Sequence, residues 1–252
     1  MLHIVVPMAG SGSRFTRAGY ARAKPLIPIL GVPMIRLVIA NLTPKCTHRF
    51  IFVCQRAHVR DFDLIPALAR WAPGSAVVQL DGLTEGAACT VLTAKALIDN
   101  DQPLMIANSD QYIDASIDAY LQSISERNLD GMIMTMQADD PKWSFAELDP
   151  NGFVTRVAEK EVISSHATVG VYNFRRGADF VRGAEKMVAE DLRVNNEFYV
   201  APVYNQLTAL GARIGVYDIG TVGRGMYGLG IPSDLEEFQA LPLAAAVTAP
   251  LR

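Results

Sequence analysis

Over its first 137 residues the chain alternates short apolar runs with segments of helical spacing, and this alternation restricts the possible folds. Continuous apolar runs of this length, such as RFIFVC and PLMIA, are typical of strands buried on both faces. Parallel strands need crossover helices between them. The pattern therefore predicts an α/β fold: a three-layer, doubly wound, mostly parallel mixed sheet. Expected strands are Leu2–Val6, Arg49–Cys54, Ala76–Leu80, Pro103–Ala107 and Gly131–Gln137, and expected helices are Met34–Leu42, Asp61–Trp71, Gly86–Ile98 and Ser116–Arg127.

After about Ala138 the pattern changes to short strands separated by turns, which predicts a small additional β region. The sequence DPNG at Asp149–Gly152 is a strong hairpin signal. No flexible linker separates the parts, so we expect one domain over residues 1–252, with a half at 1–138, a half at 139–240 and a tail at 241–252. The tail docks on the body or on a partner subunit, or is disordered. Expected elements are strands at Phe145–Leu148, Phe153–Ala158, Ala167–Phe174 and Ile214–Ile219, and helices at Asp179–Ala189, Phe198–Leu210 and Pro232–Gln239.

Composition excludes several classes of protein. The formal net charge of −3 argues against a general nucleic-acid binder. No apolar stretch reaches 18 residues, and no basic region precedes an apolar core at the N-terminus, so we expect neither a membrane span nor a signal peptide. Three cysteines without CxxC spacing are typical of a cytoplasmic protein with reduced thiols. The four histidines are scattered and suggest no metal site or serine-hydrolase mechanism.

A glycine-rich loop follows the first expected strand and precedes Lys24-Pro25. Glycines let a backbone approach an anion closely with its N–H groups pointing inward, and Arg14 and Lys24 add positive charge. The loop is neither a dinucleotide-binding GxGxxG nor a Walker P-loop. We predict that it binds a polyphosphate; the alternative is a simple turn. Its residues are Ala9, Gly10, Ser11, Gly12, Ser13 and Arg14.

Polar residues end two further expected strands. Asp110, in the sequence NSDQY, is a candidate Mg²⁺ ligand; the alternative is an Asx-turn or helix cap. Glu159 and Lys160 form an acid–base pair suited to the hydroxyl or amine and the phosphate of a second substrate, although such pairs are more often solvated surface. The cluster NNEFY, with Asn196 and Glu197, either caps a helix or presents side chains to a polar acceptor.

With these motifs in order, the chain resembles the nucleotidyltransferases that activate sugar 1-phosphates and related phosphorylated metabolites. The resemblance covers nearly the whole chain and is strongest to the short enzymes of capsule and surface-polysaccharide clusters. It implies that a phosphate oxygen of the acceptor attacks the α-phosphorus of a nucleoside triphosphate and releases pyrophosphate. The matching motifs are the glycine-rich loop with KPL, GAACTVLTA, NSDQY, VAEK, ATVGVYNF, NNEFYVAPVYN and GIPSDLEEF.

The resemblance also implies roles for the nucleotide half-site. Arg14 would hold the leaving pyrophosphate, and Lys24 would lie near the α-phosphate and stabilise developing charge. Asp110 would bind Mg²⁺. Gly86 would allow the close approach of the nucleoside.

In the acceptor half-site the resemblance assigns binding to Glu159, Lys160, Gly170, Asn196 and Glu197, with the lysine on the acceptor phosphate. Lys142 and Trp143 lie at the start of this half and are candidates for a phosphate contact and a stacking wall; a buried core tryptophan is the alternative.

Two departures from the relatives stand out. Many relatives have Asp-Thr just before the closing Gly-Thr-Pro, and that aspartate is a second metal ligand. This chain reads Tyr227-Gly228-Leu229-Gly230-Ile231-Pro232, so the carboxylate is absent, and Asp218 is the nearest upstream carboxylate.

The second departure concerns the base of the nucleotide. Thymidylyl- and uridylyl-transferring relatives place a glutamine five residues before the glycine that matches Gly86, and this chain has Asp81 there. A carboxylate only accepts hydrogen bonds, which suits the amine of cytosine or the N1–H and N2–H₂ edge of guanine. We therefore predict CTP first and GTP second, unless Gln79 takes over the role.

Two alternatives stay open at this point. A glycosyltransferase of similar architecture would use a nucleotide-sugar donor, although NSDQY lacks the Asp-x-Asp pair typical of such enzymes. A non-catalytic nucleotide-binding protein would explain the missing second carboxylate. The identity of the acceptor is open, and the apolar C-terminal region permits a homodimer without requiring one.

Overall fold

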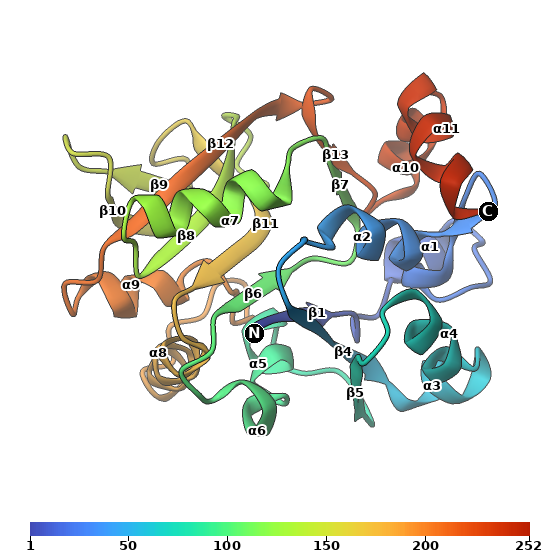
Figure 1. Ribbon diagram of the computed structural model, residues 1–252, viewed down its shortest axis with the longest axis horizontal. Coiled ribbons are helices and arrows are strands. Elements are labelled where there is room, and N and C mark those ends of the chain that lie inside the picture. Colours follow the sequence, from blue (N-terminus) through green and yellow to red (C-terminus); the bar gives the residue numbers. More distant parts are fainter.

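The computed structural model describes all 252 residues, and its centre is an eleven-stranded mixed sheet. The strands follow the order β5-β4-β1-β6-β11-β8-β12-β13-β7, with β9 and β10 attached through β11 (Figure 1). A separate two-stranded sheet pairs β2 (Pro28–Ile29) with β3 (Val32–Pro33). The predicted fold class is confirmed. Strand bounds in the large sheet are β1 Leu2–Pro7, β4 His48–Gln55, β5 Ala76–Leu80, β6 Leu104–Ala107, β7 Gln111–Ile113, β8 Gly131–Gln137, β9 Ser144–Leu148, β10 Val154–Glu159, β11 His166–Phe174, β12 Ile214–Val222 and β13 Gly225–Gly228.

Strand β1 lies between β4 and β6 and is parallel to both. Its central residues are fully buried, so both faces of the strand are covered. Strand β5 extends the parallel part beyond β4. The carboxyl ends of these four strands therefore meet at one edge of the sheet, where the glycine-rich loop and the NSD sequence begin.

Helices cover both faces of the sheet, as the side chains of β1 show. Ile4 packs in a cluster with residues of α2, α4 and α7, whereas the neighbouring Val5 packs in a second cluster with residues of α5, α8 and α9. Successive side chains of a strand point to opposite faces, so the two clusters are the two interfaces of a three-layer fold. Helix bounds are α1 Ser13–Arg17, α2 Met34–Leu42, α3 Arg56–Asp61, α4 Leu64–Trp71, α5 Ala87–Leu92, α6 Lys95–Ile98, α7 Ile117–Glu126, α8 Gly177–Ala189, α9 Val203–Thr208, α10 Pro232–Gln239 and α11 Pro242–Thr248, with 3₁₀ turns at Lys24–Leu26 and Ala249–Leu251.

The second half of the chain adds antiparallel strands to the same sheet. Strand β11 runs antiparallel to both β6 and β8 and so joins the two halves. The predicted hairpin is present between β9 and β10, where the Asp149 carboxylate accepts hydrogen bonds from the N–H groups of Asn151 and Phe153. The short strands β7 and β13, which pair with each other, were not predicted.

Three predicted helices were too long. The segment predicted at Asp61–Trp71 lies in α3 and α4, which are separated where Asp63 adopts a left-handed conformation with φ 48°. The helix predicted at Gly86–Ile98 is interrupted between α5 and α6. In place of a helix from Phe198, only α9 at Val203–Thr208 is helical. In each case the apolar residues keep a helical spacing across a position where the backbone turns, so the predicted helix extended past its true end.

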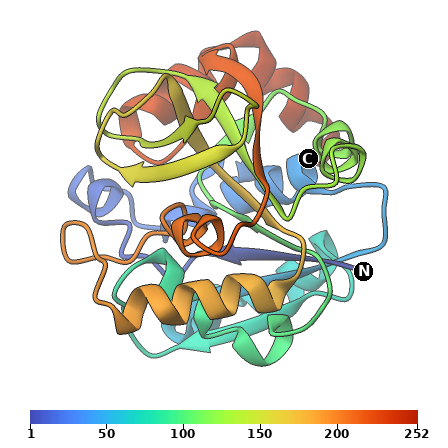
Figure 2. The same ribbon diagram turned by 90° about the vertical axis from the view of Figure 1, so that its left-hand side faces the viewer.

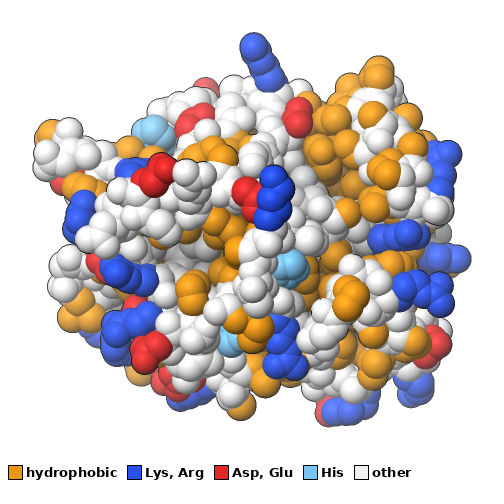
Figure 3. All heavy atoms as spheres, in the orientation of Figure 1, with side chains coloured by type: hydrophobic (Ala, Val, Ile, Leu, Met, Phe, Trp, Pro, Cys, Tyr) orange, Lys and Arg blue, Asp and Glu red, His pale blue; other side chains and the backbone are white.

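The C-terminal tail folds onto the body through α11. Ala244 and Thr248 are fully buried, and Leu243 and Val247 pack on a cluster with α10 and α1. Figure 3 shows hydrophobic side chains gathered over this region, whereas charged side chains are spread over the rest of that face. A homodimer through this surface stays a prediction. No helix of the protein has the length and apolar character needed to cross a bilayer.

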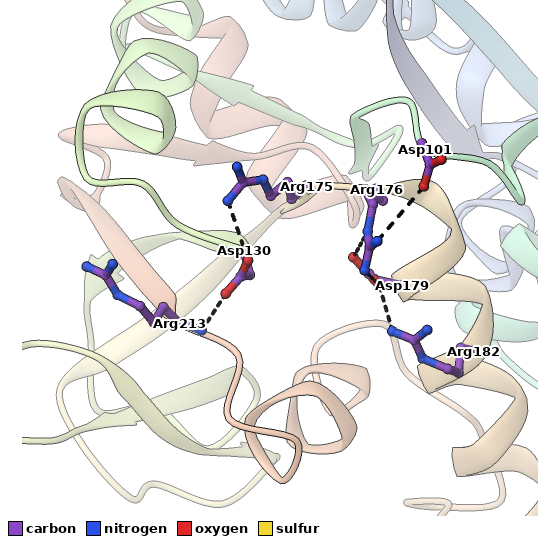
Figure 4. Close-up of polar contacts among 7 residues, drawn as sticks. All are labelled: Asp101, Asp130, Arg175, Arg176, Asp179, Arg182 and Arg213. Atoms are coloured by element: carbon purple, nitrogen blue, oxygen red, sulfur yellow. Dashed lines mark hydrogen bonds and ion pairs between the residues drawn. The ribbon is translucent and has the colours of Figure 1, made fainter.

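Ion pairs fix the junction between β11 and α8 (Figure 4). Asp179, in the first turn of α8, accepts two hydrogen bonds from Arg176, at 2.9 and 2.8 Å, and one from Arg182 at 2.6 Å. The Asp179 residue is 7% exposed, while Asp101, which lies 3.9 Å from Arg176, has a side chain that is 87% exposed. Asp179 is therefore the central carboxylate of this cluster.

We expect Asp179→Ala to lower the free energy of unfolding by about 1–2 kcal/mol, because charge-assisted hydrogen bonds are lost at a buried acceptor while both arginines regain water. Urea titration measures the change. Asp101→Ala is the matched control and should leave the midpoint unchanged, because its carboxylate is solvated. Equal effects of the two substitutions would contradict the central role of Asp179.

Candidate active site

A cleft of about 1140 Å³ lies along the carboxyl edge of the sheet and is lined by both halves of the chain. Segments after β1, β6 and β13 meet there with residues next to β9 and β10. Only three of its twenty lining residues are hydrophobic, so the cleft suits a polar ligand. The sequence-predicted residues that line it are Gly10, Ser11, Gly12, Ser13, Arg14, Lys24, Asp110, Lys142, Trp143, Lys160 and Glu197.

The glycine-rich loop presents unpaired backbone donors to this cleft. The N–H groups of residues 10 to 14 have no hydrogen-bond acceptor within the protein. Gly12 has φ 61°, and a β-carbon on it would lie 3.3 Å from Lys24 Cβ. Ala9 is buried behind the loop, and its carbonyl oxygen accepts a 2.7 Å hydrogen bond from Gln55 at the end of β4. The start of the loop is therefore held in place, while the backbone N–H groups that follow it are free to donate. This is the arrangement that cradles anions.

Lys24 and Asp110 form an ion pair within the cleft. Lys24 Nζ donates to Asp110 Oδ2 at 2.8 Å, and each side chain is 24% exposed. Lys24 opens a 3₁₀ turn, whereas Asp110 follows β6, so the pair joins segments 86 residues apart. Arg14 is exposed in the first turn of α1, directly after the loop, and forms no ion pair within the protein. Two cations and one carboxylate thus lie along the path expected for phosphates.

The NSDQ segment packs against a glycine of β11. Gly170 has φ 79°, and a β-carbon on it would overlap the side chains of Asn108 and Gln111. Gln111 is 3% exposed, and its Nε2 has no hydrogen-bond partner. The glycine therefore makes room for polar side chains that face the smaller neighbouring pocket, and Gln111 was not among the predicted site residues.

That neighbouring pocket has a volume of about 210 Å³ and holds Glu159. The Glu159 carboxylate is buried at the end of β10 and accepts a hydrogen bond from Ser144 Oγ. Burial raises the pKa of Glu159 above its ordinary value of 4.5, although the Ser144 hydrogen bond and the charge of Lys160 act in the opposite direction. Trp143 lines both this pocket and the larger cleft, in the position of a wall.

Lys160 lies at the boundary between the two cavities in an unusual conformation. Its φ of 57° is left-handed, which costs a residue with a β-carbon about 1–2 kcal/mol. Its ammonium donates to the Tyr199 hydroxyl at 3.0 Å, and this hydrogen bond raises the pKa of Lys160. Backbone strain of this kind is concentrated at functional sites, and Lys160 is one of the residues that line the cleft.

The NNEF sequence forms a tight turn, where a helix was predicted to begin. Val194 and Glu197 exchange both backbone hydrogen bonds, at 3.0 and 2.9 Å, while Asn195 and Asn196 have φ values of 49° and 63°. These values fit a type I′ turn, in which asparagine is favoured. Glu197 lines the cleft, whereas Asn196 is exposed at the tip and outside the lining residues.

Gly86 is needed by the protein's own packing. Its φ is 121°, and a β-carbon on it would lie 2.5 Å from the carbonyl oxygen of Phe198 and 2.6 Å from its nitrogen. The Phe198 N–H donates to Glu85 O at 2.7 Å, so the two segments are joined at this point. Gly86 does not line the cleft, and its predicted contact with a nucleoside stays a prediction.

Asp81 lies at the same edge of the sheet but outside the large cleft. It is exposed after β5 and accepts a 2.6 Å hydrogen bond from Arg56 Nε, which lowers the pKa of Asp81. The Arg56 guanidinium also contacts Gln79 Oε1 at 3.4 Å. The Asp81 carboxylate, which accepts hydrogen bonds, and the Arg56 guanidinium, which donates them, therefore lie side by side. Asp81 follows β5, which is two strands away from β1 and its glycine-rich loop in the order β5-β4-β1.

The structure adds a cleft residue that the sequence did not suggest. Asp234, in the first turn of α10, lines the cleft beside Gly228 and Gly230. The carboxylate considered from sequence, Asp218, is exposed on β12, where it binds Gln137 and the N–H of Gly220 instead. Sequence reasoning did not single out Asp234, because an aspartate near the start of a helix, as in IPSDLEE, needs no further explanation.

Comparison with known proteins agrees with this geometry. The family model for nucleotidyl transferases matches residues 4–220, and the chain belongs to this family. It is therefore an enzyme of the nucleotidyltransferase type, and the resemblance seen in the motifs is confirmed. No curated protein matches the sequence significantly.

Solved structures share the fold over nearly the full chain. A nucleoside-diphosphate-sugar pyrophosphorylase from Vibrio cholerae matches with a TM-score of 0.81 and 25% identity, covering 94% of this chain and 100% of the other. A protein from Bacillus anthracis, assigned as a glucose-1-phosphate thymidylyltransferase, has a TM-score of 0.77, 17% identity and coverages of 97% and 95%. The inositol-1-phosphate CTP transferase of T. maritima has a TM-score of 0.76, 14% identity and coverages of 98% and 96%.

The environment of Glu159 predicts its titration. We expect Glu159 to titrate with a midpoint above 4.5, because burial disfavours the charged carboxylate. Ser144→Ala should move the midpoint further up, because it removes a hydrogen bond to the charged form. Carboxyl ¹³C chemical shifts of glutamate-labelled protein measure both values. Ser164→Ala, which removes a hydroxyl bonded to a backbone oxygen, is the control, and a wild-type midpoint at or below 4.5 would contradict the interpretation.

Proposed function

We propose that the protein transfers a nucleotidyl group from a nucleoside triphosphate, with CTP preferred and GTP second, to a sugar 1-phosphate or a similar small phosphorylated metabolite. The observation that carries this proposal is the convergence of the free donors of the glycine-rich loop, Arg14 and the Lys24–Asp110 pair with Lys160 in one polar cleft. Such a cleft can hold the phosphates of two substrates together. The family supports the reaction class.

In this reaction an acceptor phosphate oxygen forms a bond to the α-phosphorus, and the bond from that phosphorus to the bridging oxygen of the β-phosphate breaks. Pyrophosphate carries away the released electron pair. The protein contributes alignment and charge stabilisation rather than a covalent intermediate. Arg14 and the loop N–H groups would hold the leaving pyrophosphate, and Lys24 would stabilise charge at the α-phosphate once it leaves Asp110. Lys160 would hold the acceptor phosphate.

The residues present fit a divalent cation. Asp110 offers a carboxylate next to the expected phosphates, and the Lys24 ammonium on its Oδ2 shows that this oxygen already accepts a positive partner. Carboxylate and phosphate oxygens are the ligands that Mg²⁺ prefers. When bound, Mg²⁺ would neutralise phosphate charge and help to orient the triphosphate.

The preference for CTP rests on the Asp81–Arg56 pair. Neighbouring strands are about 4.8 Å apart, so β5 lies roughly 10 Å from β1 across the sheet, which is enough for the sugar and base of a nucleotide whose phosphates lie on the loop. Asp81 would accept from the exocyclic amine of cytosine, and Arg56 would donate to its acceptors. The likeness to a CTP transferase from T. maritima agrees with this proposal but shows the fold alone.

For the acceptor we propose the pocket between Glu159 and Gln111, with Gly170 at its wall. Glu159 accepts hydrogen bonds and Gln111 Nε2 has a donor to spare, so together they suit hydroxyl groups, which both donate and accept. Glu197 lines the larger cleft next to this pocket. A role in surface-polysaccharide synthesis rests on the resemblance of the motifs.

Pyrophosphate release from each of five triphosphates with Mg²⁺, against a panel of phosphorylated acceptors, tests the reaction. We expect release with CTP above the others. Lys24→Ala and Asp110→Asn should each lower kcat about 10²–10³-fold, because each removes charge aligned with the reacting phosphate.

Lys45→Ala is the matched control, since this lysine is 93% exposed and pairs with Asp118 away from the cleft. Transfer from a nucleotide-sugar without pyrophosphate would favour a glycosyltransferase. Unchanged turnover in both cleft variants would refute the proposed mechanism.

Asp81→Gln should move the preference from CTP toward UTP by roughly tenfold in the ratio of kcat/KM values, because an amide can donate to the uracil carbonyl where a carboxylate cannot. Steady-state kinetics with both nucleotides measure the ratio. Asp99→Asn, an exposed change outside the site, should leave it constant. A ratio that does not move in Asp81→Gln would rule out base recognition by this residue.

A further inference from the structure

A row of buried hydroxyl groups leads through the wall of the proposed acceptor pocket to the Glu159 carboxylate. Ser144, at the start of β9, donates to Glu159 Oε2, and the two residues are cross-strand partners in the β9–β10 hairpin. On β11, the hydroxyls of Thr168 and Tyr172 lie 3.0 Å apart. All four residues are less than a tenth exposed, and all four line the pocket. The pocket therefore has a charged acceptor that is backed by buried hydroxyl groups.

The backbone of β11 is irregular where two of these hydroxyls meet. In a regular strand, the α-carbons of residues four positions apart are about 13 Å from each other. The pairing of β11 with β8 changes register between Thr168 and Tyr172, and Gly170, with φ 79°, lies within this interval. The irregularity and the length of the tyrosine side chain together let the two hydroxyls meet. Irregularities of this kind re-aim side chains next to active sites.

The protons of these hydroxyls can be given a direction. A charged carboxylate only accepts hydrogen bonds, so the single hydroxyl proton of Ser144 goes to Glu159, and the Ser144 oxygen is left to accept. Burial raises the pKa of the Tyr172 hydroxyl, and hydrogen bonds with Thr168 and Ser144 act in the opposite direction. A phenol whose pKa is raised keeps its proton at neutral pH and can donate it. Donation therefore runs from Thr168 to Tyr172, then to Ser144 and finally to the carboxylate.

Tyr172 is the rigid member of this row. The hydroxyl of a serine rotates to suit its partners, and the terminal torsion of a glutamate side chain has a broad minimum. Ser144 alone would therefore not fix the direction of the carboxylate. The Tyr172 ring packs in the cluster that contains residues of α5, α8 and α9, and close packing holds its hydroxyl in one place.

The second oxygen of the carboxylate, Glu159 Oε1, accepts no hydrogen bond within the protein and is not among the fully buried unpaired atoms. We propose that Tyr172 is a positioning residue for the acceptor: through Ser144 it holds Oε2 of Glu159 in the pocket wall, which leaves Oε1 directed at a hydroxyl group of the acceptor. This inference rests on the proposed nucleotidyl transfer and specifies how its acceptor site is oriented. Tyr172 does not line the larger cleft, so the nucleotide half-site should not depend on it.

Tyr172→Phe removes the hydroxyl and keeps the ring. Pyrophosphate release is measured with CTP and the acceptor that wild-type protein turns over fastest, from a panel that includes glucose 1-phosphate and inositol 1-phosphate. We expect the acceptor KM to rise about three- to tenfold, the effect of one lost hydrogen bond, with kcat and the KM for CTP unchanged. Tyr120→Phe is the matched control, because this buried tyrosine donates to the Met132 carbonyl oxygen at 2.8 Å, away from the pocket. It should leave all of these constants unchanged.

A second readout needs no substrate. If Tyr172 acts through Ser144, then Tyr172→Phe should raise the titration midpoint of Glu159, as Ser144→Ala does. The same substitution should change the midpoint no further in protein that already carries Ser144→Ala. Carboxyl ¹³C chemical shifts of glutamate-labelled protein measure the midpoint. Lys160 and Glu197, the charged groups that act on this carboxylate, are the same in all of these variants.

Thermal unfolding verifies that each variant is folded. Tyr172→Phe with the acceptor KM and the Glu159 midpoint of wild type would overturn the inference, and so would equal changes in Tyr120→Phe. Effects of Tyr172→Phe that persist in full beside Ser144→Ala would also overturn it, because the two residues would then act independently. In each of these cases, pyrophosphate release by wild-type protein shows that only the role of Tyr172 fails. If wild-type protein releases none with any acceptor, the proposed function fails, and the titration shows separately whether the hydroxyl row is present.

Discussion

Strand β1 is hydrogen-bonded to parallel neighbours on both sides and covered by helices on both faces. The glycine-rich loop, which follows the carboxyl end of β1, therefore lies at one particular edge of the sheet. The same register brings the ends of β4, β5 and β6 to that edge, so the glycine-rich loop, Asp81 and Asp110 are positioned by backbone pairing. The chemistry of the cleft depends on this constraint because none of these residues is near another in sequence.

Much of the fold could be predicted because its determinants are local. The strand at Ala76–Leu80 and the helix at Met34–Leu42 were predicted with the bounds that the structure has, since buried apolar runs and amphipathic spacing are visible within a few residues. The short strands β7 and β13 are stabilised by each other, 113 positions apart at Ile113 and Met226. The break at Asp63 depends on one left-handed residue that no spacing reveals.

Part of the candidate site was predicted from the sequence and part of it was missed, for similar reasons. The loop and Asp110 follow strands and were predictable from the rule that ligands bind at the carboxyl ends of parallel strands. Glycines were less informative, because sequence does not say what approaches them. Gly86 was assigned to a nucleoside, and the backbone of Phe198 approaches it in the structure. Gln111 was missed because it lies in β7, a strand that was not predicted. Asp234 was missed because an acidic residue in the first turn of a helix needs no further explanation.

The Lys24–Asp110 pair has a consequence for how the cleft accepts its substrates. Without ligands the lysine neutralises the carboxylate at 2.8 Å, which avoids an unpaired charge in a partly buried place. A triphosphate competes for the lysine through its own negative charge, and the carboxylate then needs another cation. Nucleotide and divalent cation should therefore bind with positive coupling, each favouring the other through a shared ion pair.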